Sequence, residues 1–146
     1  MKSFENKVAA ITGAGSGIGR ALALALARQG CHLALSDVNQ AGLNETTEMA
    51  LKLGVKASQT LVNVADRAAV EAWATQVMAD YGQINAIFNN AGVAQGGTVE
   101  GNAYADYEWV MNINFWGVVN GTKALLPHLK ASGCGHIINT SSTFGL

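Results

Sequence analysis

Residues 12–19 read TGAGSGIG and stand between a short apolar stretch, residues 8–11, and the Ala/Leu-rich stretch 21–27. A strand that gives way to glycines and then to a helix brings backbone N–H groups up to a phosphate. Glycine allows positive φ angles and the close approach of a pyrophosphate, and the helix N-terminus adds a partial positive charge. The sequence therefore favours a nucleotide-binding protein of the α/β class.

The rest of the chain fits one well-buried domain of that class. Its 146 residues are one domain at most, and 49% of them are hydrophobic while only 13% are charged. Short apolar stretches alternate with stretches of helical period, a pattern typical of a parallel sheet with right-handed crossovers and helices on both faces. Strands are predicted over residues 8–12, 32–36, 56–62, 86–88 and 136–140.

Helices are predicted between these strands from their apolar stripes. One stripe, after an N-cap at Asp66, consists of Val70, Trp73, Ala74, Val77, Met78 and Tyr81. An earlier stripe, after an N-cap at Asn39, consists of Leu43, Thr47, Ala50 and Leu51. A helical pair is predicted between residues 103 and 131, with a bend or a frayed turn at Pro127. The stripe of its second member consists of Phe115, Val118, Val119, Thr122, Leu126 and Leu129.

Charge and hydropathy argue against several classes of partner. A net charge of -1 without any run of Lys or Arg gives no electrostatic footprint for nucleic acid or an anionic membrane. No apolar span approaches the ~20 residues that cross a bilayer, and the N-terminus shows no signal region, so we expect a cytoplasmic protein. Cys31 and Cys134 have neither metal-ligand spacing nor a disulfide pattern, and both are expected to be small buried thiols.

Asp37 ends the second predicted strand. From this position a carboxylate can accept hydrogen bonds from the hydroxyls of an adenosine ribose, and it would repel a 2′-phosphate. No Lys or Arg follows until Lys52, and Ala14 and Ser16 in the loop supply no cation either. The sequence therefore favours NAD over NADP. The alternative is that Asp37 only initiates the helix that follows.

The spacing of the motifs then points to a family. Ile18 stands where the general G-x-G-x-x-G fingerprint has its third glycine, and the loop fits T-G-x-x-x-G-x-G instead. Residues 89–92 read NNAG, Asn114 lies in MNINFWG at 111–117, and residues 137–142 read IINTSS. With these motifs in this order, the sequence resembles the short-chain dehydrogenase/reductase family over essentially its whole length.

That resemblance implies an oxidoreductase that transfers a hydride between a nicotinamide cofactor and a secondary alcohol or ketone. It implies that Ser142 orients the substrate oxygen and that the backbone carbonyl of Asn114, at a helix kink, holds a proton-relay water. The alternatives are a turn hydroxyl for Ser142 and a surface helix residue for Asn114. Trp109 and Trp116 would line a substrate cleft or, as is more common for aromatic residues at helical spacing, belong to a core or an interface.

The cofactor would be held at the carboxyl ends of the strands. Ile18 would give a backbone N–H to the pyrophosphate, and residues 90–92 would pass beside the ribose or brace the sheet. Asn63 and Val64 stand where the family commonly has Asp-Val beside the adenine, so adenine recognition is expected with an altered bond pattern. The implied cofactor-binding residues are Gly13, Ser16, Gly17, Ile18, Gly19, Asp37, Asn63, Val64, Asn90, Ala91 and Gly92.

The family's catalytic Tyr-x-x-x-Lys does not occur in the sequence, which ends four residues after Ser142. General acid–base help contributes about 10²–10⁴-fold, so we expect these 146 residues alone to turn over poorly. The expected identity is the N-terminal part of a single NAD(P)-binding Rossmann domain, a doubly wound parallel sheet of order 3-2-1-4-5 that lacks the last strands and helices. A non-catalytic nucleotide-sensing pseudoenzyme is the alternative.

The same resemblance suggests how the protein assembles and how its sheet ends. The full-length protein is expected to form a homodimer or homotetramer through the helix that ends near Leu129. The apolar pair Ile137 and Ile138 would lie on an unprotected edge strand, and such edges invite aggregation.

Overall fold

Five parallel strands form one sheet in the order β3-β2-β1-β4-β5, which confirms the predicted order. The structure, a computed structural model, describes residues 3–143. The strands are β1 (Val8–Thr12), β2 (His32–Asp37), β3 (Ala57–Leu61), β4 (Ala86–Asn89) and β5 (His136–Asn139). Because every strand pair is parallel, the carboxyl ends of all five strands meet at one edge of the sheet.

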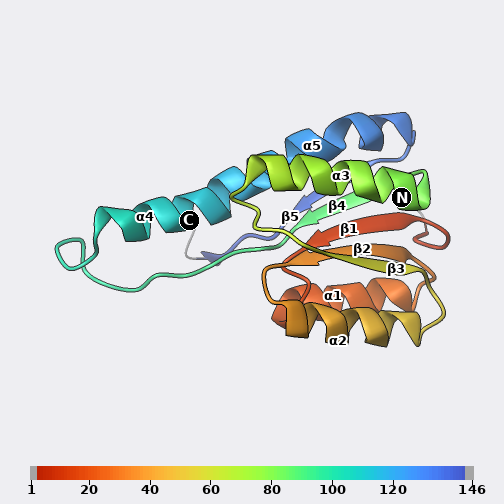
Figure 1. The fold of residues 1–146 in the computed structure, drawn as a ribbon, viewed down its shortest axis with the longest axis horizontal. Helices are drawn as coiled ribbons and strands as arrows, with labels where there is room; N and C mark the ends of the chain where they lie inside the picture. Colours follow the sequence, from red (N-terminus) through yellow and green to blue (C-terminus); the bar gives the residue numbers. More distant parts are fainter. Residues whose placement is uncertain (1–2, 144–146) are drawn as a thin grey trace.

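Helices cover both faces of this sheet, so the doubly wound Rossmann-type α/β fold is confirmed (Figure 1). The helical segments are α1 (Gly17–Ala27), α2 (Gln40–Leu51), α3 (Arg67–Tyr81), α4 (Tyr104–Met111), η1 (Asn112–Trp116) and α5 (Gly117–Ala131). Figure 1 shows α1 and α2 on one face, and α3 and α5 on the other. No helix within residues 3–143 is long and apolar enough to span a bilayer.

The central strands carry the core. All five residues of β1 are buried, because β1 lies between two strands and two helical layers. One core cluster joins the sheet to α1 and α2 through residues such as Ile11, Leu35 and Leu43. The other joins it to α3 and α5 through residues such as Trp73 and Leu125.

The helices α2 and α3 follow the sequence patterns closely. Asn39 caps α2 by accepting a hydrogen bond from the Gly42 N–H at 3.2 Å, and Asp66 caps α3 by accepting one from Ala69 at 3.1 Å. The stripe predicted on α3 packs into the core as expected. On α2 the predicted stripe is wrong at Leu51, the last residue of the helix, which is 51% exposed.

The predicted helical pair between residues 103 and 131 is one continuous run. α4 passes into α5 through the π-helical segment η1, in which the Gly117 N–H donates to the Asn112 carbonyl. A π turn adds one residue to the helical repeat and shifts the phase of everything downstream. The helix also continues through Pro127 to Ala131, and Pro127 is exposed on its solvent side.

The side of α5 that meets the sheet differs from the stripe read in the sequence. The buried residues are Gly117, Gly121, Leu125 and Leu129, and only Leu129 belongs to the predicted stripe. The two glycines let the helix approach closely: a Cβ on Gly121 would collide with the Asn89 side-chain oxygen, and one on Gly117 would lie 2.6 Å from Val64 Cγ2. Because glycine has no apolar side chain, the pattern of apolar residues in the sequence does not reveal this face of α5.

α4 and the loop before it extend beyond the sheet, on the side of its carboxyl edge (Figure 1). No residue of α4 is buried, and Trp109 and Trp116 are 45% and 51% exposed. Neither tryptophan therefore belongs to the core of residues 3–143. The exposure predicted for Ile137 and Ile138 is confirmed: β5 lies at the edge of the sheet, and the two residues are 40% and 37% exposed.

The two cysteines differ from each other. Cys31 is buried as expected, and burial raises the pKa of its thiol to about 11. Cys134 was predicted to be buried but is only half-buried, because it lies in the turn before the edge strand β5. Its sulfur accepts a hydrogen bond from the Asn85 side-chain amide at 3.3 Å.

The close approach of α5 to β4 yields a first prediction. Ala normally stabilises a helix interior by about 1 kcal/mol relative to Gly. At Gly121, however, we expect Ala to lower the free energy of unfolding by about 1–3 kcal/mol, because its Cβ collides with Asn89. Urea unfolding measures the change. Gly96→Ala is the control, since a Cβ there meets no atom within 4 Å, and equal stability of the two variants would contradict the contact.

Candidate functional site

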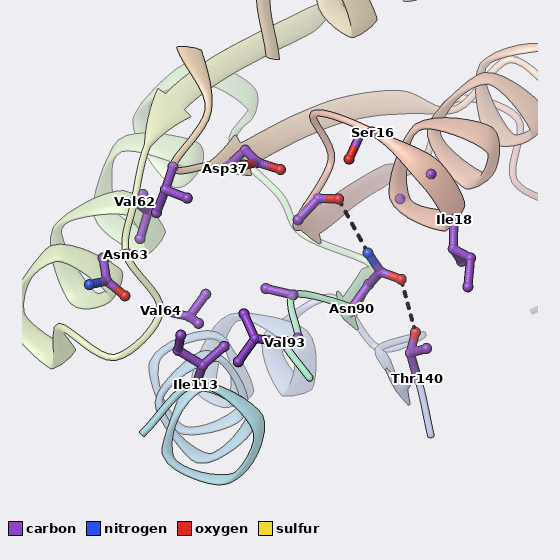
Figure 2. A pocket seen from close by; sticks show the side chains of 16 residues that line it. Ser16, Ile18, Asp37, Val62, Asn63, Val64, Asn90, Val93, Ile113 and Thr140 are labelled. Carbon is purple, nitrogen blue, oxygen red and sulfur yellow. Dashed lines mark hydrogen bonds between the residues drawn. The ribbon is translucent and has the colours of Figure 1, made fainter. Parts of the chain in front are cut away.

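A pocket of about 360 Å³ opens at the carboxyl edge of the sheet (Figure 2). It is formed by the turns that follow β1, β2, β3 and β4, together with η1 and the end of β5. Every residue predicted to bind the cofactor lines it. The lining consists of Gly13, Ser16, Gly17, Ile18, Gly19, Asp37, Val38, Val62, Asn63, Val64, Asn90, Ala91, Gly92, Val93, Ile113 and Thr140.

The glycine loop is pressed against the β4 side of the pocket. Gly13 has φ +67°, and a Cβ there would lie 2.8 Å from the Ala91 Cα. A Cβ on Gly19 would collide with the carbonyl oxygen of Gly13. Gly17 has φ +52° but nothing within 4 Å of its Cβ position, so open space lies above this residue. The glycines therefore allow close packing of the loop against the β4 side, and they leave open space on the side that faces the pocket.

The N-terminus of α1 presents backbone N–H groups without intrahelical partners to this open space. The first three N–H groups of α1, from Gly17 to Gly19, precede the first intrahelical bond, which runs from the Arg20 N–H to the Ser16 carbonyl at 3.1 Å. The N-cap Ser16 makes no side-chain cap, whereas Asn39 and Asp66 cap their helices. Open backbone donors at a helix N-terminus fit the pyrophosphate of a dinucleotide.

Asp37 lies across the pocket at the end of β2. Its Oδ2 accepts a hydrogen bond from the Gly15 N–H at 2.7 Å, and its Oδ1 accepts one from the Asn39 N–H at 2.9 Å. The first bond ties the carboxylate to the glycine loop, and the second supports the start of α2. A carboxylate has about four lone-pair sites, so it retains acceptors that could meet ribose hydroxyls. Both roles weighed for Asp37 in the sequence are compatible with this geometry.

The wall opposite the glycine loop is mainly apolar. Val62 and Val64 lie on it after β3, and Val93 and Ile113 face them from the β4 loop and η1 (Figure 2). Asn63 Oδ1 accepts a hydrogen bond from the Ala65 N–H at 3.0 Å, so its oxygen already supports the turn. An apolar wall with one polar amide fits a flat heteroaromatic ring such as adenine.

Asn90 joins three strand ends beneath the pocket. The Thr12 hydroxyl accepts hydrogen bonds from the backbone N–H groups of Asn90 and Ala91, both at 3.0 Å. The Asn90 amide donates to the Thr12 carbonyl at 3.1 Å, and its oxygen accepts a bond from Thr140 at 3.2 Å. Figure 2 shows the bond to Thr140. The bracing role predicted for this motif is therefore visible in its contacts.

Asn114 lies in the π-helical segment η1. Its Oδ1 accepts a hydrogen bond from the Val93 N–H at 2.9 Å, and its Nδ2 donates to the Val93 carbonyl at 2.8 Å. The side chain thus fixes the loop after β4, and the neighbouring Ile113 lines the pocket. Ser142 lies exposed just beyond β5 and does not line this pocket, whereas Thr140 does. Gly145, the glycine that follows the IINTSS motif of residues 137–142, lies outside the described residues.

Five lining residues were not identified from the sequence: Val38, Val62, Val93, Ile113 and Thr140. Each is adjacent, or nearly adjacent, to a residue that was identified. Their signal is positional, because each follows the end of a strand or sits at the π turn, and parallel topology brings such positions together.

The bonds to Thr12 yield a second prediction. Thr12→Val keeps the shape of this buried side chain but removes the acceptor of two backbone N–H groups. We expect a loss of about 2 kcal/mol in the free energy of unfolding, because two partly buried donors are left unpaired. Thr12→Ser keeps the hydroxyl and should retain most of the stability in the same denaturant titration. A Val variant as stable as the Ser variant would show that these bonds carry little weight.

Known proteins are similar to this chain in sequence and in fold. The family model described as short chain dehydrogenase matches residues 7–146. A Mycobacterium tuberculosis protein named as oxidoreductase SadH is 53% identical over 146 residues, which are 100% of this chain and 53% of that protein. The chain therefore spans about half the length of the curated relatives it matches.

Two solved structures extend the similarity to three dimensions. A short-chain dehydrogenase/reductase from Burkholderia phymatum in complex with NAD is 36% identical, with a TM-score of 0.96 over 99% of this chain and 52% of that one. An alcohol dehydrogenase from the archaeon Thermococcus sibiricus, complexed with 5-hydroxy-NADP, is 33% identical, with a TM-score of 0.89 over 93% of this chain and 58% of that one. With its glycine loop, strand order and motif spacing, this chain belongs to the short-chain dehydrogenase/reductase family.

Proposed function

We propose that this chain forms the coenzyme-binding part of an NAD-dependent oxidoreductase that acts on a secondary alcohol or ketone. The observation that carries the proposal is the pocket between the open N-terminus of α1 and the Asp37 carboxylate. The NAD-bound relative from Burkholderia phymatum supports it, because its fold overlaps this one over nearly the whole chain. Residues 1–146 would be the N-terminal part of a single NAD(P)-binding domain.

Each wall of the pocket would hold one part of the coenzyme. The N–H groups of Gly17, Ile18 and Gly19 would bind the pyrophosphate, with Gly13 and Ser16 shaping the loop. Asp37 would accept hydrogen bonds from the ribose hydroxyls. The adenine would pack between the apolar side chains on the opposite wall, beside Asn63 and Val64, and residues 90–92 would support the coenzyme from below. When bound, the nicotinamide ring supplies the hydride acceptor or donor.

Ser142 and Asn114 are proposed to act near the reacting end of the coenzyme. Ser142 follows β5 at the carboxyl edge, the same edge that holds the pocket, and its hydroxyl would orient the substrate oxygen. The carbonyl of Asn114 would hold a proton-relay water, because a π turn changes which carbonyls are used inside the helix. The Asn114 side chain, already bonded to Val93, would keep that carbonyl in place.

The preference for NAD over NADP is proposed from Asp37. A 2′-phosphate would bring negative charge next to this carboxylate, and the repulsion would weaken NADPH binding. Relatives with either coenzyme share this fold, since one solved structure holds NAD and another holds an NADP derivative. The local charge, rather than the fold, is therefore what would decide the preference.

A homodimer or homotetramer is proposed through α4 and α5. α4 exposes Tyr107 and Trp109, and it carries the acids Asp106 and Glu108. α5 carries Lys123 and a second lysine near its end. Antiparallel pairing of the α4–α5 run with a second copy would cover the aromatic side chains and bring opposite charges together. A cytoplasmic location is proposed as well, since no apolar span of the sequence approaches the ~20 residues that cross a bilayer.

Light scattering of the whole protein tests the assembly. We expect a dimer or a tetramer, and we expect Trp109→Asp to shift it towards the monomer, because a charge would be buried in the contact. Leu51→Asp is the matched control, since Leu51 is similarly exposed but lies on α2. A monomeric wild-type protein would contradict this assembly.

Fluorescence titration of the whole protein with NADH and NADPH tests the coenzyme assignment. We expect tighter binding of NADH, and we expect Asp37→Asn to narrow that advantage by about tenfold or more, since hydrogen bonds to a charged group are worth about 1.5–3 kcal/mol. Asp66→Asn removes the same charge from a helix cap outside the pocket and should leave both affinities unchanged. Tighter binding of NADPH to the wild type would overturn the preference.

A further inference from the structure

The Arg20 side chain connects the glycine loop to α2 from behind the pocket. Its Nη2 donates to the Gly15 carbonyl at 2.6 Å and to the Gly42 carbonyl at 3.4 Å. Its Nε donates to the Thr46 hydroxyl at 3.0 Å, and Nη2 also forms an ion pair with Glu45 at 2.8 Å. Arg20 does not line the pocket.

Arg20 occupies a position in α1 where a positive charge is electrostatically unfavourable. Arg20 lies near the N-terminus of α1, whose first turn holds no acidic residue, and a cation there opposes the helix dipole. The acceptors that compensate all belong to the loop before α1 or to α2. The contacts are also mutually consistent: Thr46 is fully buried, and its hydroxyl accepts from Arg20 while donating to the Gly42 carbonyl at 3.0 Å.

Through its bond to the Gly15 carbonyl, Arg20 acts on a residue that also contacts Asp37. The Gly15 N–H donates to Asp37 Oδ2 at 2.7 Å, while the Gly15 carbonyl accepts from Arg20. A Cβ on Gly15 would lie 2.9 Å from Asp37 Oδ2, and one on Gly42 would meet the Gly15 oxygen. The residue is therefore held by hydrogen bonds on both sides and by packing, so its orientation and that of the Asp37 carboxylate are coupled.

We propose that Arg20 is a positioning residue that holds Gly15 so that the Asp37 carboxylate is oriented for a ribose without a 2′-phosphate. The inference rests on the proposed NAD-binding function. Arg20 acts through Gly15 and touches no coenzyme. Without Arg20 the Gly15 carbonyl loses its hydrogen bond, so the orientation of Gly15 and of its N–H donor to Asp37 Oδ2 is less tightly fixed. The Asp37 carboxylate then meets the ribose hydroxyls in a less well-defined orientation. NADH therefore loses more affinity than NADPH, which draws no favourable bond from that carboxylate.

The test measures dissociation constants for NADH and for NADPH on the whole protein with Arg20→Met, Arg20→Lys and Arg67→Met. We expect Arg20→Met to raise the NADH constant by about tenfold and the NADPH constant by clearly less, which narrows the ratio between them. Arg20→Lys should fall between Met and wild type, because an ammonium keeps the charge but lacks the planar fork. Arg67→Met is the matched control: it removes an arginine ion-paired to Glu71 at 2.7 Å outside the pocket, and it should change neither constant.

The ratio of the two constants separates positioning from stability alone, because loss of stability lowers the affinity for both coenzymes together. If the wild type binds NADH but Arg20→Met has the same ratio of NADH and NADPH dissociation constants, the role of Arg20 is overturned. The proposed function would still stand in that case. A wild type that binds neither coenzyme would overturn both. If Arg20→Met does not fold, two further single variants carry the test: Arg20→Lys, and Glu45→Gln, which removes the ion-pair partner of Arg20. A wild-type ratio of the NADH and NADPH dissociation constants in both folded variants would overturn the inference.

Discussion

The close approach of backbone to backbone around residues 13–19 is the constraint on which the rest of this structure depends. Gly13 and Gly19 lie against each other and against the segment after β4, and Gly15 lies between Asp37 and α2. Larger side chains would force these segments apart. Because the loop is held from below, the N–H groups at the start of α1 face open space. The pocket is therefore a product of packing between crossover units and does not depend on any one side chain pointing into it.

A second set of bonds holds the strand ends in register around that loop. Thr12 at the end of β1 binds the backbone of Asn90 and Ala91, and Thr140 after β5 binds the Asn90 side chain. Asn114 extends the network to the helical run that leaves the sheet. Residues distant in sequence thus form one connected edge. Such pre-organisation reduces the entropy lost when a ligand binds.

Much of the fold and of the pocket could be predicted because the responsible residues have local signatures. These signatures are the glycine spacing, the N-caps Asn39 and Asp66, and the acid Asp37 at the end of β2. The face of α5 could not be read, because Gly117 and Gly121 contribute to it by lacking side chains and the π turn shifts the helical phase. The contacts of Arg20 could not be predicted either, since its partners lie in the glycine loop and on α2, and its position opposes the usual charge preference at a helix start.

Amide hydrogen exchange of the whole protein with and without NAD+ tests the central claim most directly. If the pocket at the carboxyl edge binds the dinucleotide, exchange should slow at residues 13–19, at residues 37–38 and at residues 62–64, which line opposite walls. α4 projects away from the sheet and should be unaffected by the coenzyme itself. NAD+ binding without protection of residues 13–19 would contradict the account, because the ligand would then lie away from the open N-terminus of α1.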